Sequence, residues 1–247
     1  MSDEFLTSAC EGGVRRLTLD GGAAHPLSLG MIRALHRTID EAVSDPETRV
    51  IMIHGPGRIF CAGHDLKEIA AHRTGPDHGA TYLTELFDAC AAMMQALVGC
   101  PLPTIAVVEG IATAAGLQLV ASCDLAYAST AARVCLPGVR NGGFCSTPAV
   151  ALARVIGQKH LMDLLLTGED RTADWALRAG LFTEVLPQAD LHPRVDAVAR
   201  TLATRAAGAI ATGKATLAAQ IDLPLDRAYA LASPVMVQSF LSPDRKR

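Results

Sequence analysis

The amino-acid sequence predicts an α/β protein whose last part is helical. Short apolar stretches, of the kind that form buried strands, alternate along most of the chain with longer stretches in which apolar residues recur every three or four positions. Strands that alternate with helices favour a parallel sheet. From about residue 190 onward only helical patterns follow. We therefore expect a core domain at residues 1–189 and a C-terminal helical region at 190–247.

Length and composition limit the class of protein. The chain has 247 residues, of which 50% are hydrophobic and 19% are charged, as in a folded domain and unlike a disordered chain. Only 4% are aromatic and the net charge is −3, which leaves few stacking platforms and no broad basic surface for nucleic acid. We expect no nucleic-acid partner.

Cysteine usage and the start of the chain favour a reducing compartment. The seven cysteines form no Cys-x-x-Cys pair, and their odd number does not fit a disulfide framework. The acidic first residues lack the features of a signal or transit peptide. The uncharged segment 89–108 has the length of a membrane span, but Gly99, Pro101 and Pro103 interrupt it. We expect a cytoplasmic protein with no membrane partner.

The expected elements follow in chain order. The first strand, at 14–20, shows partial alternation of apolar and polar residues, and Ser28 is placed to cap a first helix whose apolar residues share one face. Further strands are expected at 50–53, 104–108, 125–128, 134–136 and 182–186. Further helices are expected at 82–98, 115–122, 148–156, 159–166, 173–178, 190–206 and 214–220.

The first candidate site segment runs from Phe60 to Glu68. An apolar strand enters a turn at Gly63, and Asp65 is placed to cap the charged helix that follows. Backbone N–H groups at such a helix start, around Gly63 and His64, can hold a carbonyl oxygen or an oxyanion. An ordinary strand–turn–helix connection explains the same pattern.

The second candidate segment runs from Glu109 to Asp124. A buried strand leads into very small residues at 112–116 and then into an apolar helix. Small residues allow close approach of the backbone, either to a ligand, as a second donor to the same oxygen, or to another chain segment in tight packing. The segment contains neither G-x-G-x-x-G nor a P-loop motif, so we expect no nucleotide-phosphate site here.

The third candidate segment runs from Leu136 to Pro148. Three glycines and two prolines predict an irregular loop before a helix, and such loops often line binding sites. The eight histidines show no metal-ligand spacing along the chain, so we expect no metal site.

At these three segments the sequence resembles the crotonase superfamily, that is, the enoyl-CoA hydratase/isomerase family. The resemblance rests on Ala-Gly-x-Asp-Leu at 62–66, the small-residue run that ends in Cys-Asp at 123–124, and Pro-x-x-x-x-Gly at 137–142, which occur in family order and at family spacing. It spans roughly residues 17–187 and continues more weakly to about residue 240.

Details within the same segments resemble one subgroup of this family that occurs in animals and bacteria. They are Gly-His-Asp-Leu-Lys-Glu at 63–68, the run at 112–124 that contains Gln118, and Phe-Cys-Ser-Thr-Pro at 144–148.

The resemblance implies a fold, a ligand and a site. The fold is a spiral of ββα turns with a C-terminal helical region, usually in a homotrimer or a dimer of trimers. The ligand is an acyl-CoA thioester, so coenzyme A enters as part of the substrate and no separate cofactor is expected. By position, the two backbone donors for the thioester oxygen fall on His64 and Ala115. Each donor can contribute about 3–4 kcal/mol to stabilising a thioester enolate.

Two departures from the family pattern bear on activity. Hydratases of the family use two glutamates to add water across the double bond, and by position these are Gln118 and Gly138 here. Glutamine accepts no proton near neutral pH and glycine has no side chain, whereas a positioned acid or base contributes about 10²–10⁴ in rate. The resemblance therefore implies carbonyl polarisation without the usual acid–base pair.

Few side chains are placed to replace that pair. Cys145 lies where some family members have a carboxylate, and its ordinary pKa of about 8.5 could be lowered by nearby N–H dipoles; the alternative is a buried small hydrophobic residue. Gln118 can orient a water or the substrate carbonyl, or bond to nearby backbone. His64 is a candidate base unless its ring faces solvent. Asp124 is expected to form structural hydrogen bonds.

The resemblance also implies contacts with the CoA part of the substrate. These are the backbone of Ala62, Gly63, Asp65 and Leu66, the segment His25, Pro26 and Leu27, and Lys214 near the CoA phosphates. Gly116, Gly138 and Phe144 are further residues expected to contact the substrate. The basic tail at 245–247 is expected to be solvated. Family members usually continue into a final helix that helps to cover the pocket, and we expect this chain to lack it.

Two functions of different class follow. The first is an enoyl-CoA hydratase-like lyase or isomerase that polarises the thioester in a backbone oxyanion hole and uses atypical acid–base residues. The alternative is a catalytically silent module that binds acyl-CoA or acts through an oligomeric surface, which the absence of both glutamates favours.

Overall fold

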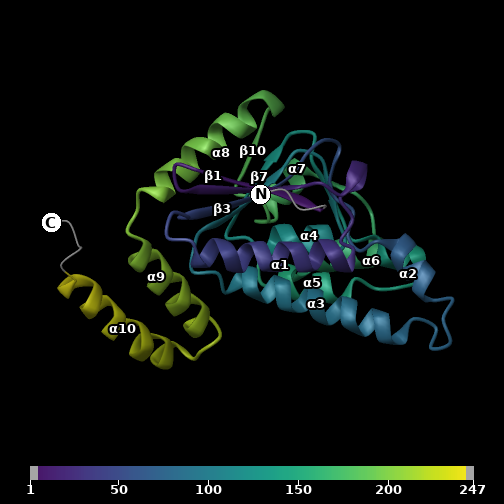
Figure 1. Cartoon of the computed structure of the whole chain (residues 1–247). Helices are drawn as coiled ribbons and strands as arrows, with labels where there is room; N and C mark the ends of the chain where they lie inside the picture. Colours follow the sequence, from purple (N-terminus) through teal and green to yellow (C-terminus); the bar gives the residue numbers. More distant parts are fainter. Residues whose placement is uncertain (1–4, 243–247) are drawn as a thin grey trace.

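Two β-sheets form the framework of the structure, a computed structural model that describes residues 5–242 (Figure 1). The basic tail at 245–247 lies outside the described residues. The larger sheet has the strand order β1 (Leu6–Glu11), β2 (Val14–Leu19), β3 (Val50–Gly55), β5 (Thr104–Val108), β7 (Leu125–Ser129) and β10 (Glu184–Leu186). The smaller sheet has the order β4 (Ile59–Cys61), β6 (Ile111–Thr113), β8 (Arg133–Cys135) and β9 (Arg171–Thr172).

Successive chain segments add one strand to each sheet and then a helix. Strands β3 and β4 precede α2 (Leu66–His72) and α3 (Ala80–Val98), β5 and β6 precede α4 (Ala115–Ala121), and β7 and β8 precede α5 (Ser146–Leu152). Within each sheet these strands are parallel neighbours in the same order. The three segments are therefore turns of a spiral, and the α/β fold with ββα turns that the sequence predicts is confirmed.

The remaining helices complete the fold around the sheets. They are α1 (Leu29–Ser44), α6 (Gln158–Thr167), α7 (Ala173–Arg178), α8 (Gln188–Ala203), α9 (Ala207–Gln220) and α10 (Leu225–Leu241), with short 3-10 turns at Gly22–Ala24 and Pro137–Asn141. Ser28 caps α1 as predicted, because its Oγ accepts from the Met31 N–H at 3.0 Å. Helices α1 and α3 lie side by side (Figure 1).

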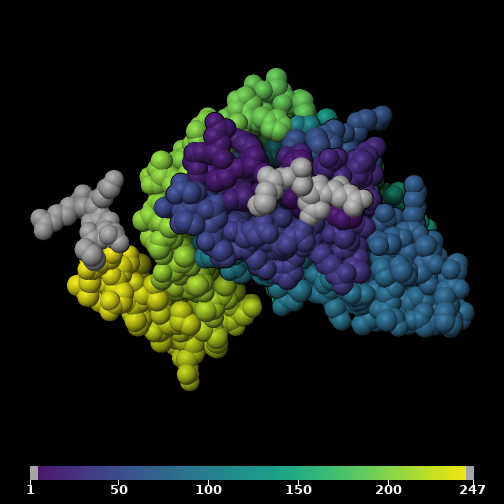
Figure 2. Space-filling model, viewed as in Figure 1, coloured from purple at the N-terminus to yellow at the C-terminus, as the bar shows by residue number. Residues whose placement is uncertain are grey.

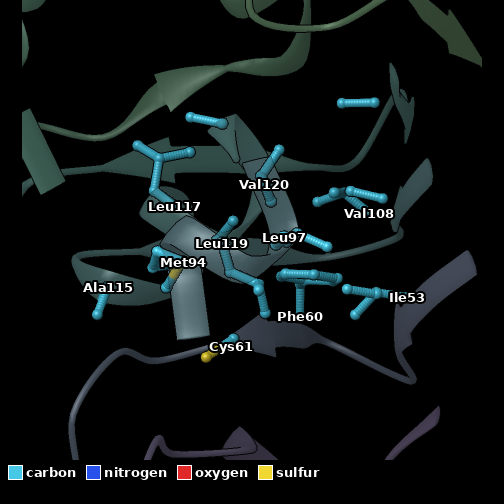
Figure 3. Close-up of a cluster of buried hydrophobic side chains, with 14 of the residues drawn as sticks. Ile53, Phe60, Cys61, Met94, Leu97, Val108, Ala115, Leu117, Leu119 and Val120 are labelled. Atoms are coloured by element: carbon cyan, nitrogen blue, oxygen red, sulfur yellow. The ribbon is translucent and has the colours of Figure 1, made fainter. Parts of the chain in front are cut away.

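The inner strands β3 and β5 of the larger sheet are buried on both faces. In β3, Ile51 and Ile53 join the main core with α1 and α3, whereas Val50 and Met52 join a second apolar cluster under α8. Successive side chains of a strand point to opposite faces, so two apolar faces produce a continuous apolar run in the sequence. Figure 3 shows the centre of the main core, where α4 side chains meet Ile53 and Phe60.

The sequence patterns missed the edge strand β1, the short strands β6 and β9, and helix α10. The edge strand β1 is antiparallel to β2, and its pattern is weak because most of its side chains are exposed. Helix α10 buries only Ala228 and contains Pro234, so it carries no apolar stripe that faces this chain. Helix α10 (Leu225–Leu241) thus lies beyond the last helix that the sequence patterns predict. Helices α9 and α10 project from the body of the molecule (Figures 1 and 2).

The long uncharged segment divides between two buried elements. Residues 89–98 end helix α3 and Thr104–Val108 form β5, with the prolines between them, as the sequence predicts. Across residues 5–242, no helix is both long and apolar enough to cross a membrane.

At the junction between β3 and β4, a side chain added at Gly55 should clash with the backbone and destabilise the fold. A Cβ on Gly55 would lie 2.0 Å from Phe60 O, whereas a Cβ on Gly213, in α9, would meet nothing within 4 Å. We expect Gly55→Ala to lower the free energy of unfolding by about 3 kcal/mol or more, because backbone must shift. Gly213→Ala is the control and should raise it by roughly 0.5–1 kcal/mol through helix propensity. Chemical denaturation measures both; equal effects would contradict the close contact.

Candidate functional site

The turn between β4 and α2 positions the first predicted donor. The Leu27 N–H donates to Gly63 O at 2.8 Å and Leu27 O accepts from the Asp65 N–H at 3.3 Å, so Leu27 pairs with both neighbours of His64. Since successive N–H groups of an extended chain point to opposite edges, the His64 N–H points away from Leu27. Within residues 5–242 it has no hydrogen-bond acceptor. Asp65 caps α2 as predicted, accepting from the Lys67 and Glu68 N–H groups.

The turn between β6 and α4 positions the second predicted donor. The Ala114 N–H bonds to Cys135 O at 3.0 Å, which keeps it in register with β8. Ala114 itself has φ 51° and ψ −123°, a conformation that costs a residue with a Cβ about 1–3 kcal/mol. This strained residue is the only one between the end of β6 at Thr113 and the start of α4 at Ala115. The N–H of Ala115, the first residue of α4, is also without an acceptor in the described part of the chain.

These two turns are in contact. A Cβ on Gly63 would lie 2.9 Å from Ala114 Cβ and 3.1 Å from Ala115 N, and Gly63 has φ +85°. Only glycine fits both the space and the left-handed backbone there. The structure therefore brings the N–H groups of His64 and Ala115 onto adjoining turns, and a pair of unbonded N–H groups can stabilise an oxygen that gains negative charge. Gly116 lies on the same contact, since a Cβ there would be 2.2 Å from Cys61 O.

Gln118 shares this side of α4, because residues three apart lie on one face of a helix. Its side chain is buried, and its Oε1 has no hydrogen-bond partner. An unpaired buried oxygen costs about 1–3 kcal/mol. Of the two alternatives for Gln118, the structure therefore does not show a bond from this oxygen to nearby backbone. The oxygen is available to accept a hydrogen bond from a ligand or a water.

A side chain at position 138 would need space that Cys145 fills. A Cβ on Gly138 would lie 2.9 Å from Cys145 N and 3.0 Å from Cys145 Sγ, so a larger residue requires the Phe144–Cys145 backbone to move. Burial raises the pKa of the half-buried Cys145 thiol, although a hydrogen bond from the Gly138 backbone acts in the opposite direction. Of the two alternatives for Cys145, this direction favours the buried small residue over a thiol activated by N–H dipoles. The Phe144 side chain is half exposed.

The His64 ring turns toward α3 instead of solvent. It packs edge-on against Phe87, with ring centroids 5.0 Å apart, and its Nε2 is buried without a partner. Burial lowers the pKa of His64 to about 4. The ring is therefore neutral at neutral pH, able to accept a proton but only as weakly basic as a carboxylate.

Comparison with known proteins identifies the family. The profile of the enoyl-CoA hydratase/isomerase family matches residues 10–247. The chain belongs to the enoyl-CoA hydratase/isomerase family. The sequence is 41% identical, over 95% of this chain and 78% of the relative, to enoyl-CoA hydratase domain-containing protein 3, mitochondrial, from Xenopus laevis. This relative confirms the predicted subgroup.

Two solved structures of the enoyl-CoA hydratase/isomerase family share the fold. One is an enoyl-CoA hydratase/isomerase family protein from Silicibacter pomeroyi, with TM-score 0.91 and 55% identity over 95% of this chain and 99% of that chain. The other is human enoyl Coenzyme A hydratase domain-containing protein 3, with TM-score 0.91 and 38% identity over 97% of this chain and 93% of that chain.

The expected cytoplasmic location is not supported by these relatives and is corrected. The Xenopus laevis relative and its counterparts from Rattus norvegicus, Mus musculus, Homo sapiens and Danio rerio are all named mitochondrial. Reduced cysteines and an acidic start were the basis of the expectation, and neither separates the cytosol from another reducing compartment.

The segment that the family resemblance assigns to CoA binding lies beside the first donor. Ala62 N–H bonds to Ala24 O, and Leu27 pairs across His64, so residues 24–27 and 62–65 run together. The His25 ring is committed within the protein, because Nε2 donates to Pro56 O at 3.0 Å and Nδ1 accepts from the Gly21 N–H at 3.3 Å. Leu66, by contrast, is exposed.

Lys214 is held at the far end of α4. Its Nζ donates to Leu102 O at 2.8 Å and to Asp124 Oδ2 at 2.5 Å, and Asp124 also accepts from the Thr104 N–H and Oγ1. Asp124 thus forms the structural bonds expected of it. Within one chain the structure places Lys214 in this network and away from Ala115, so its contact with CoA phosphates stays a prediction.

Relief of the strain at Ala114 is measurable. We expect Ala114→Gly to raise the free energy of unfolding by about 1 kcal/mol, because glycine adopts this φ and ψ without penalty and only part of the gain is lost to the freer unfolded chain. Urea denaturation of both proteins measures the change. A matched control is Ala121→Gly in the same helix, which should destabilise by about 1 kcal/mol. If both variants are less stable than the original protein, Ala114 is not strained.

The buried His64 ring predicts a pH dependence of stability. The unfolded chain binds the proton with an ordinary pKa of about 6.5, whereas the folded pKa is about 4, so stability falls as the pH drops from about 6.5 toward 4. The slope for one such group approaches about 1.4 kcal/mol per pH unit. His64→Phe should remove this component in denaturation measured at pH 7, 6 and 5. Parallel slopes for the two proteins would refute it.

Proposed function

We propose that this chain binds an acyl-CoA thioester and polarises its carbonyl between the N–H groups of His64 and Ala115. The observation that carries the proposal is the pair of unbonded N–H groups on adjoining turns, held by the Gly63 contact and the strained Ala114. Membership of the enoyl-CoA hydratase/isomerase family supports the thioester as ligand. A positioned donor of this type contributes about 3–4 kcal/mol to stabilising the developing oxyanion.

The proposed reaction is an enoyl-CoA hydratase-like addition or a double-bond isomerisation with unusual proton-transfer groups. Gln118 cannot take a proton, but its unpartnered Oε1 can accept a hydrogen bond from an attacking water and hold it in place. The Cys145 thiol and the neutral His64 ring are the titratable groups of the site that remain for proton transfer. Coenzyme A enters with the substrate, and the proposal includes no separate cofactor.

The family resemblance further supports a homotrimer or a dimer of trimers as the working assembly. Helix α10 carries large apolar side chains that are exposed in one chain: Leu225, Tyr229, Met236, Val237 and Leu241. Burial of such a surface between subunits is favourable at about 25 cal/mol per Å².

The alternative is a silent acyl-CoA-binding or oligomerisation module. One observation favours it: position 138, where the resemblance implies the second glutamate in hydratases, has no room for a side chain unless Cys145 moves. In that case the two N–H groups bind the thioester and no group completes the proton transfer.

Crotonyl-CoA separates the two functions. Concentrated protein is mixed with crotonyl-CoA, the enoyl thioester absorbance is followed, and the product is identified by mass. We expect absorbance loss with addition of one water, at a rate below that of a hydratase with both glutamates by a factor of about 10² or more. No change at a concentration where calorimetry shows saturated binding would favour the silent module. No binding at all would refute the thioester site.

Gln118→Leu tests the role of the unpaired oxygen. Removing a buried unsatisfied group should raise the free energy of unfolding by about 1 kcal/mol, while crotonyl-CoA turnover falls by at least about tenfold. The control is Gln95→Leu, at an exposed position of α3, which should leave turnover unchanged. A Gln118→Leu protein that is more stable and equally active would show that this oxygen is not used.

A further inference from the structure

Three side chains of metal-binding type converge at the α8 edge of the larger sheet. His54 lies in β3, Glu109 directly follows the neighbouring strand β5, and His192 lies near the start of α8. In β3 the residue two before His54, Met52, faces α8, and in β5 so does Val107, two before Glu109. The alternation of each strand therefore carries His54 and Glu109 to the α8 face, where His192 meets them.

The three potential ligand atoms are close together. His54 Nε2 lies 3.2 Å from Glu109 Oε1, the His192 Nε2 contacts the same oxygen, and all three atoms lie within 4.8 Å of one another. In a tetrahedral zinc site with bonds of about 2.0–2.1 Å, ligand atoms are separated by about 3.4 Å. Small side-chain adjustments are sufficient to reach that geometry.

Hydrogen bonding inside the protein satisfies only part of this cluster. His192 bonds to Glu109, whereas the buried His54 Nε2 lies 3.2 Å from Glu109 Oε1 without forming a well-aligned hydrogen bond to any described residue. The two rings are edge-on, with centroids 4.9 Å apart, so they do not bond to each other. A buried imidazole nitrogen beside a carboxylate oxygen and a second imidazole lacks a partner that a cation would supply.

We propose that His54, Glu109 and His192 form a zinc(II) site. Two imidazoles and one carboxylate are a ligand set that zinc accepts, with water in the fourth position. That position faces solvent beside the His192 side chain, which is 40% exposed. A bound ion ties α8 to the ends of β3 and β5, a role separate from thioester binding.

Zinc binding is measured on the tag-free full chain in reducing agent that does not chelate metals. Competition against a chromophoric chelator gives the affinity, and thermal unfolding gives the stability. At a free zinc concentration 100 times the dissociation constant, we expect the midpoint to rise by about 5 °C or more. Cobalt(II) should give d–d bands without a thiolate charge-transfer band, which separates this site from the cysteines. No midpoint rise, or a thiolate band alone, would overturn the proposal.

Variants assign the ligands. Glu109→Gln and His192→Ala should each weaken zinc binding by at least about 100-fold, since loss of outer-shell partners alone costs about 10–100-fold. His36→Ala is the matched control, because His36 is also partly exposed and lies 3.9 Å from a carboxylate, Asp40, with no second imidazole. It should not change the affinity. Equal affinities for all four proteins would overturn the site, and folding of each variant is checked by its midpoint without metal.

Discussion

The contact between the β4–α2 turn and the β6–α4 turn is the constraint on which the candidate site depends. It requires glycine at 63, because a side chain would meet Ala114 and the Ala115 nitrogen. It requires Ala114 to hold an unfavourable backbone conformation so that α4 begins at once. The surrounding parallel strands, buried on both faces, supply the packing energy that maintains this strain.

Polar groups with hydrogen-bond partners and polar groups without them lie at opposite ends of helix α4. At one end of α4, Asp124, Thr104 and Lys214 form a closed network in which each group has partners. At the other end, the His64 and Ala115 N–H groups and the Gln118 oxygen have no partner among residues 5–242. Several polar groups without hydrogen-bond partners at one place lower the stability of the fold, and such groups are typical of a ligand-binding site.

Local patterns in the sequence were sufficient for most of the core. The Ser28 and Asp65 caps, the apolar runs of β3 and β5 and the small-residue turn before α4 all follow from short-range physics, and all are present. Strand β1 and helix α10 were missed because most of their side chains are exposed in one chain. The raised pKa of Cys145 and the meeting of His54, Glu109 and His192 depend on tertiary packing between distant segments, which spacing along a chain does not contain.

The close packing around Gly138 limits which substitutions this position accepts. Because Cys145 backbone lies against the place where a Cβ would start, a carboxylate at 138 is not reached by a single substitution in this background. The Phe144–Cys145 segment would have to move first, and that change alone brings no acid–base group. The order of the two changes therefore matters, because a side chain at 138 fits only after the Phe144–Cys145 segment has moved.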